Sequence, residues 1–369
     1  MKPSPSALLV LEDGSAFEGR AVGEGTSFGE VVFNTSMTGY QEILTDPSYR
    51  GQIVVMTLPH IGNYGVASSV AESTRPWVEG FVARQFTSRP SSHGSEEGLV
   101  SYLRRHHLPA IDGVDTRAIV RRVRERGALR GVLTSERSDV SALVAEVQEY
   151  PLMAGRALVD EVTCAESFEL APEDRDPDFH LAVYDFGVKS NILRSLVRRG
   201  ARVTVLPART PWRHCIDLGV DGVLLSNGPG DPEPLEEVIE NVRGLVSSGV
   251  PLFGICLGHQ LLGLGVGGQT FKLKFGHHGG NQPVRDLATG RVLITSQNHG
   301  FAVDPDSLPD NCRVSQVNLN DGTVEAFVVE NRPVLSAQYH PEAAPGPHDA
   351  AGLFDSFLES VVERVAKQR

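Results

Sequence analysis

The chain has 369 residues and a formal net charge of −12, with 40% hydrophobic and 22% charged residues. At about 150 residues per domain, this length predicts two or three domains, each large enough to bury a core of its own. The composition excludes a disordered or fibrous chain. The negative charge argues against nucleic acid or an anionic membrane as the main partner.

The sequence carries no membrane or disulfide signature. No apolar run approaches the roughly 20 residues that a membrane helix needs, and the first apolar stretch ends at Glu12 and Asp13. The four cysteines lie far apart and form no CxxC pair, which disfavours a zinc knuckle or a disulfide framework. We therefore expect a cytoplasmic protein in a reduced compartment.

The first part of the chain is strand-like. Apolar alternation and glycine turns in residues 7–22, 29–39 and 51–63 predict short strands. From about Ser101 the spacing becomes helical, with Ala118, Ile119 and Val123 on one face and a stop at Gly127. We expect a β-rich mixed N-terminal domain over residues 1–153.

A linker is expected next, over residues 154–179. Its last part, FELAPEDRDPDF, combines acidic residues and prolines without any period, which is typical of a surface segment. The second domain then covers residues 180–369.

Short apolar runs alternate with amphipathic segments after the linker. This strand–helix order predicts an α/β fold with a doubly wound, mostly parallel sheet. From Gln269 the alternating stretches predict antiparallel additions at the edge of that sheet, and residues 348–367 predict a closing helix.

The most informative segment is Gly254-x-Cys256-x-Gly258, between a buried-type strand and a helix. This is the arrangement of a nucleophile elbow, with cysteine in place of serine. The helix N-terminus would favour the thiolate that attacks. The alternative is a buried cysteine that acts as a small hydrophobe, and the two glycines count against it.

A cysteine nucleophile needs a base and a group that orients the base. His340-Pro341-Glu342 supplies both, because residues i and i+2 of an extended backbone project to the same side. Donors for the oxyanion are expected from the loop 226–232 (SNGPGDP) and from the N–H of Leu257. The alternative for the loop is an ordinary Gly-Pro turn.

Other patterns are weaker. The glycines of residues 263–268 follow a helix and not a strand, so they predict a helix terminus and no dinucleotide loop. His277, His278 and His299 have no carboxylate or cysteine at a ligand-like spacing, so we expect no metal. An arginine run forms either a solvated helix face or a docking surface for a partner; its members are Arg117, Arg121, Arg122, Arg124, Arg126 and Arg130.

Taken together, GICLGHQLL, the preceding SNGPGDP and the following HPE resemble the class I, triad-type glutamine amidotransferases. The strings KFGHHGGNQPV, TSQNHGFAV and, in the N-terminal half, VVFNTSMTGYQEILTDPSY are similar to the carbamoyl-phosphate synthase small-chain family. Tyr339 departs from some members, which have glycine there, and residues 154–179 match poorly.

The resemblance implies a catalytic triad of Cys256, His340 and Glu342. It also implies contacts to the substrate L-glutamine, which match Ser48, Gly228, Gly230, Leu257, Gln260, Asn298, Gly300 and Phe301.

The resemblance further implies a glutaminase that hands ammonia to a large chain. That partner would use bicarbonate and MgATP to make carbamoyl phosphate for arginine and pyrimidine synthesis. No glycine-rich phosphate loop followed by Lys-Ser or Lys-Thr occurs in this sequence, so we expect no cofactor in this chain. The alternatives are an amidotransferase that serves another synthase, a catalytically silent docking subunit, and a cysteine peptidase on the same sheet.

Overall fold

The computed structural model describes residues 5–368 and divides into two compact units. The first contains residues up to Ala154 together with Lys274–Gly279, and the second contains Gly155–Leu273 and residues from Gly280 onward. None of the described helices is long and apolar enough to cross a membrane.

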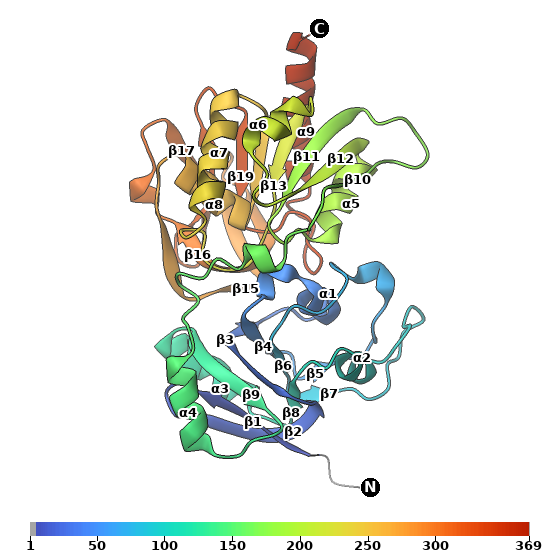
Figure 1. The fold of residues 1–369 in the computed structure, drawn as a ribbon, viewed down its shortest axis with the longest axis vertical. Helices are drawn as coiled ribbons and strands as arrows, with labels where there is room; N and C mark the ends of the chain where they lie inside the picture. The colour runs from blue at the N-terminus through green and yellow to red at the C-terminus, as the bar shows by residue number, and fades with distance from the viewer. Residues whose placement is uncertain (1–4, 369) are drawn as a thin grey trace. The chain divides into compact units, whose positions relative to one another are not determined.

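A closed barrel forms the first unit, as Figure 1 shows. Its strand order is β1-β2-β8-β6-β4-β3-β9. The strands are β1 (Ser6–Leu11), β2 (Ala16–Gly23), β3 (Thr26–Asn34), β4 (Gln52–Met56), β6 (Gly80–Val82), β8 (Ala110–Asp112) and β9 (Leu129–Thr134). The sequence predicted strands here, and their closure into a barrel depends on pairings between residues far apart in the chain, such as Leu9 with Leu133.

Four helices occur among the described residues of this unit. They are α1 (Tyr40–Thr45), α2 (Leu99–Arg105), α3 (Thr116–Arg126) and α4 (Val140–Glu149). Asp115 caps α3 by accepting from the N–H of Ala118, and Ile119 and Val123 pack against the barrel core. A short pair, β5 (His60–Ile61) and β7 (Gln85–Phe86), and the 3-10 turns η1 (Pro47–Tyr49) and η2 (Ser68–Val70) complete it.

The second unit contains a six-stranded sheet in the order β10-β12-β11-β13-β14-β19. These strands are β10 (Phe168–Leu170), β11 (Phe179–Asp185), β12 (Ala201–Pro207), β13 (Gly222–Leu225), β14 (Leu252–Ile255) and β19 (Val334–Ala337). All pairs are parallel except β10 with β12. The expected α/β class with a mostly parallel sheet is therefore confirmed.

Helices cover both faces of this sheet (Figure 1). On one face α6 (Trp212–Asp217), α7 (Glu236–Ser248) and α8 (Leu257–Gly265) pack against side chains such as Ala182 and Tyr184. On the other face α5 (Ser190–Arg198) and α9 (Gly352–Gln368) pack against Leu181 and Val183. The alternation along β11 thus divides the apolar side chains between two cores.

The strands after Gln269 differ from the expectation. β15 (Thr270–Asp286), β16 (Val292–Val303), β17 (Cys312–Asn318) and β18 (Val324–Val329) form a separate sheet in the order β16-β15-β17-β18. β19, which we expected among the antiparallel additions, pairs parallel with β14. Alternating apolar residues identify a strand but not the neighbour it pairs with. The sequence alone therefore did not show which of these strands join the parallel sheet and which form a second sheet.

Residues 155–178 have structure of their own. Val159, beside the turn η3 (Val159–Glu161), is fully buried in a core of the second unit, and β10 pairs antiparallel with β12. We predicted a linker here because the segment combines acidic residues and prolines without a period. The limits at residues 153 and 180 stay a prediction, while the compact units divide between Ala154 and Gly155.

Candidate active site

Cys256 lies in a strained elbow between β14 and α8. Its backbone angles are φ 54° and ψ −104°, a conformation that non-glycine residues rarely adopt. Its N–H donates to the carbonyl of Ala337 on the adjacent strand, and its Sγ lies 3.6 Å from the carbonyl oxygen of Asn298. Cys256 is 2% exposed, so its thiol is buried.

The two glycines that flank Cys256 allow close backbone approach. A Cβ at Gly258 would lie 2.1 Å from the carbonyl oxygen of Leu225, and one at Gly254 would lie 2.6 Å from the carbonyl oxygen of Gly258. Neither glycine has a positive φ, so the backbone strain falls on Cys256 itself. The elbow read from the sequence is therefore present in the structure.

His340 is close to Cys256 because their strands are neighbours. β14 and β19 pair parallel, with Ile255 opposite Ala337, so the residues that follow both strands emerge at the same carboxyl edge of the sheet. The His340 N–H also donates to the carbonyl of Ser296 at 2.9 Å, which fixes the backbone there.

Glu342 holds the imidazole of His340 at its Nδ1 nitrogen. Nδ1 of His340 lies 2.7 Å from Oε1 of Glu342, and the same oxygen accepts from Nζ of Lys189 at 2.9 Å. All three side chains are at least 97% buried. This arrangement leaves Nε2 of His340 directed away from Glu342.

The charges around His340 and Glu342 shift the pKa of both side chains. Burial lowers the pKa of His340, but the Glu342 carboxylate and the nearby Cys256 thiol outweigh burial and raise it above the usual value. Burial raises the pKa of Glu342, but Lys189 and His340 outweigh that effect and lower it below the usual value. The geometry therefore favours an imidazolium beside an ionised carboxylate.

A second histidine on the elbow helix has a different environment. His259 is fully buried and packs against the ring of Phe327, with centroids 5.2 Å apart. Burial lowers its pKa to about 3, so its ring stays neutral. Its position favours a packing role, and His340 remains the base that the geometry supports.

The loop after β13 packs against the start of α8. The N–H of Gly258 donates to the carbonyl of Ser226 at 3.0 Å, and a Cβ at Gly228 would lie 2.2 Å from the carbonyl oxygen of Phe186. Gly230 has a φ of +88°, which favours glycine. Gly228, Gly230 and Leu257 are thus held at the same sheet edge as Cys256.

The remaining expected glutamine contacts in this unit lie on α8 and β16. The side chain of Gln260 donates to the carbonyl of Phe301 at 2.9 Å and to Oε1 of Gln338 at 3.1 Å. Asn298 contacts the thiol of Cys256 through its carbonyl oxygen, and Gly300 and Phe301 follow on the same strand. The structure thus brings these four residues to the elbow.

Ser48 belongs to the first unit. It lies in η1, is buried, and its N–H donates to Oδ1 of Asp46 at 2.9 Å. Its contact with glutamine stays a prediction.

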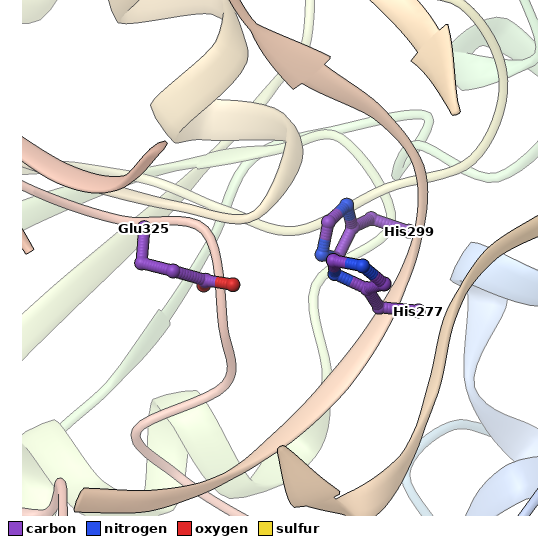
Figure 2. A group of neighbouring side chains, drawn as sticks. All are labelled: His277, His299 and Glu325. Carbon is purple, nitrogen blue, oxygen red and sulfur yellow. The ribbon is translucent and has the colours of Figure 1, made fainter. Parts of the chain in front are cut away.

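The histidines that we considered as metal ligands lie on β15 and β16. Figure 2 shows His299 on β16 and Glu325 on β18, two strands of one sheet; His277, also labelled, belongs to the first unit. Glu325 is a carboxylate that the sequence spacing did not place beside a histidine. Both ring nitrogens of His299 face protein oxygens. The absence of a metal stays a prediction.

Sequence reasoning missed two residues that hold the triad. Lys189 donates to Glu342 and to the carbonyl of Ala343 at 2.6 Å, and Asn191 donates to the carbonyl of Glu342 at 2.6 Å. Both residues lie in the segment YDFGVKSNILRS, where the chain passes from β11 to α5, and neither had a predicted role. A lysine at a helix start gave no signal because its buried partner is more than 150 residues away.

Two family models match the chain. The class-I glutamine amidotransferase model matches residues 182–360, and the model of the carbamoyl-phosphate synthase small chain, CPSase domain, matches residues 9–133. The "Carbamoyl phosphate synthase small chain" of Yersinia pseudotuberculosis is 50% identical over 371 residues, which cover 96% of this chain and 95% of that protein.

The protein of the same name from Escherichia coli is 48% identical and covers 96% of this chain and 97% of its own length. The protein of the same name from Syntrophotalea carbinolica is 50% identical, and the match covers 96% of this chain and 97% of that protein.

The chain belongs to the carbamoyl-phosphate synthase small-chain family. As a member of that family with a class-I glutamine amidotransferase domain, it is a glutamine-hydrolysing enzyme subunit. The match at residues 9–133 favours this family over amidotransferases that serve other synthases. The family assignment from the sequence is confirmed.

Proposed function

We propose that this chain hydrolyses the side-chain amide of glutamine and delivers the ammonia to a carbamoyl-phosphate synthase large chain. The observation that carries the proposal is the strained Cys256 elbow beside the buried His340–Glu342 pair. The names of its relatives, which are small chains, support a heterodimer with a large chain.

The first half of the proposed reaction makes a thioester. The Cys256 proton already rests on Nε2 of His340, so Sγ attacks the side-chain carbonyl carbon of glutamine as a thiolate. The oxygen becomes an oxyanion that backbone N–H groups of Leu257 and the 228–230 loop stabilise. His340 then protonates the leaving nitrogen, the C–N bond breaks, and ammonia departs from a γ-glutamyl thioester.

The second half frees Cys256. His340 removes a proton from water, the hydroxide attacks the thioester carbonyl, and the C–S bond breaks to release glutamate. The proton stays on His340 beside the Sγ thiolate, which restores the starting pair. Glu342 keeps the imidazole oriented through both halves and offsets its charge, and Lys189 holds Glu342 in place.

The large chain would supply the remaining chemistry. In this proposal it combines ammonia with bicarbonate, uses MgATP, and yields carbamoyl phosphate for arginine and pyrimidine synthesis in the cytoplasm. This chain would then use neither metal nor cofactor, which agrees with the lack of a phosphate-loop motif in its sequence.

Glutamate release tests the proposal. It is measured with this chain alone, and then with its large chain, bicarbonate and MgATP. We expect release to rise when partner and substrates are added, with carbamoyl phosphate in proportion to glutamate. Absence of glutamate release in both cases would overturn the proposal and favour a silent docking subunit.

A further inference from the structure

A line of buried polar side chains runs from Glu325 on β18 to the carbonyl of Phe301 on β16. Nε2 of Gln297 donates to Oε1 of Glu325 at 2.8 Å. Oε1 of Gln297 lies 3.2 Å from Nε2 of His299, and Nδ1 of His299 lies 2.8 Å from the carbonyl oxygen of Phe301. Figure 2 shows His299 and Glu325, the two ionisable members of this line.

The orientation of the Gln297 amide follows from its other contact. Oγ1 of Thr295 gives its own hydrogen to the carbonyl of Gln282 at 2.9 Å, so it can accept from Nε2 of Gln297 at 3.2 Å. The amide nitrogen thus has two acceptors, Thr295 and the Glu325 carboxylate. The amide oxygen must therefore face His299.

His299 then has an oxygen acceptor at each ring nitrogen. Neither the Gln297 amide oxygen nor the Phe301 carbonyl carries a hydrogen, so an imidazolium, with a hydrogen on each ring nitrogen, satisfies both contacts. A buried cation needs a buried counter-charge. Glu325, which is 0% exposed, supplies it across one amide.

We propose that Glu325 is a positioning residue of the glutamine site, which acts through Gln297 to keep His299 protonated and the Phe301 carbonyl fixed. Phe301 is one of the expected glutamine contacts, so the inference rests on the proposed function. The carbonyl of Phe301 also accepts from Gln260, whose second amide hydrogen goes to Gln338. The side-chain oxygen of Gln260 is thereby left to receive the substrate.

Steady-state kinetics of glutamate release by the complex with the large chain test this role. Glu325→Gln keeps the size of the side chain and removes its charge. We expect the KM for glutamine to rise at least about tenfold while kcat changes less than about threefold, because the contacts of His340 and Glu342 are untouched. Gln297→Leu, which breaks the line at its middle, should give the same division between KM and kcat.

The matched control is Glu30→Gln, which removes a buried glutamate of the barrel. It should leave the KM for glutamine within about twofold, although it can lower Tm. An unchanged KM in Glu325→Gln, or an equal rise in the Glu30→Gln control, would overturn the positioning role.

Protonation of His299 is measured separately by NMR of the full chain with ¹⁵N-labelled histidine. The His299 signals are those that disappear in His299→Gln. We expect two protonated ring nitrogens in the unsubstituted chain at pH 7.5 and one in Glu325→Gln. A neutral His299 in the unsubstituted chain would overturn the inference. Because this readout needs no turnover, it remains distinct from a failure of the proposed glutaminase activity.

Discussion

Nδ1 of His340 lies 2.7 Å from Oε1 of Glu342, and both side chains are buried at the carboxyl edge of the parallel sheet. This single contact orients the imidazole and places a negative charge beside it. Since Lys189 contacts the same carboxylate oxygen, the three residues form one buried charged group. Removal of Glu342 takes away the carboxylate that Lys189 and His340 share, which is costly in a protein interior.

The first prediction concerns stability against pH. Glu342 raises the pKa of His340 above 6.5, so their interaction stabilises the fold fully below pH 6.5 and is lost as pH rises through the folded value. The pKa of Glu342 lies below 4.5, so its contribution is lost only as pH falls below that. The interaction therefore contributes most between these two values.

Glu342→Gln should lower the free energy of unfolding by about 3–5 kcal/mol near pH 6, the range for breaking a buried charge pair. The difference from the unsubstituted chain should shrink as pH rises above 6.5. Urea denaturation at pH 6, 7.5 and 9 measures it. A difference that stays constant over this range would mean that His340 is not charged in the folded protein.

A second prediction separates the roles of base and orienting group. His340→Asn removes the proton acceptor, whereas Glu342→Gln retains an oxygen near Nδ1 and only weakens orientation and charge. We expect kcat for glutamate release to fall about 10⁴-fold in His340→Asn. The fold-loss in Glu342→Gln should be at least about tenfold smaller. Equal losses would show that Glu342 does more than orient and offset the charge of His340.

A third prediction tests the division of labour between the chains. Cys256→Ser removes the nucleophile for the amide half of the reaction and nothing that free ammonia needs. In the complex with the large chain, synthesis of carbamoyl phosphate from glutamine should disappear while synthesis from ammonium salts remains. Loss of both activities would contradict the separation of glutaminase and synthase between two chains.

The fourth prediction concerns the elbow. Gly258→Ala would bring a Cβ to 2.1 Å from the carbonyl oxygen of Leu225, which no side-chain rotation can relieve. We expect a loss of about 1–3 kcal/mol in the free energy of unfolding from this overpacking, together with reduced glutamate release because Cys256 moves. Gly352→Ala on the same unit is the control for activity, since apart from its chain neighbours nothing lies within 4 Å of its Cβ. Full activity in Gly258→Ala would show that the elbow tolerates displacement.

The sequence was sufficient for the elbow because that site is local. Gly254, Cys256 and Gly258 lie within five residues, so their spacing alone predicts the strand-to-helix turn that the structure contains. His340 and Glu342 were also recognisable, since they are two residues apart. The parallel register of β14 with β19 then brings the two motifs together.

The sequence did not predict contacts between residues that lie far apart in the chain. Nothing in the spacing of Lys189 indicates Glu342, and nothing near His299 indicates Glu325. The barrel likewise closes through β1 with β9, which lie at opposite ends of the first unit's sequence. Hydrophobic alternation predicts which face of a strand is buried and leaves its partner undetermined.

The arginine run shows both what the sequence predicted and what it left undetermined. Arg130 lies outside the helix, on β9, where it pairs with Glu12 at 2.6 Å, and Arg122 lies 3.4 Å from Asp13. Arg117, Arg121 and Arg124 are exposed and follow each other at helical spacing along one stripe of α3. The sequence identified the charges, and the structure separates those that stabilise the barrel from those on its surface.

The last prediction assigns this stripe to the large chain. Arg117 lies in the first turn of α3, where a cation is disfavoured by the helix dipole, and like charges follow at i+4 and i+7. Such a placement fits contact with an acidic surface of a partner.

Replacement of Arg117, Arg121 and Arg124 by glutamate should weaken binding of the large chain at least about tenfold at low salt. The difference in affinity between this variant and the unsubstituted chain should become smaller at high salt, because exposed charges are screened. Isothermal titration calorimetry at two salt concentrations measures the change. The control replaces the exposed Arg89, Arg243 and Arg313 and changes the net charge equally. Equal weakening in both triple variants would indicate a general charge effect, and unchanged binding in the first would identify the stripe as solvated surface.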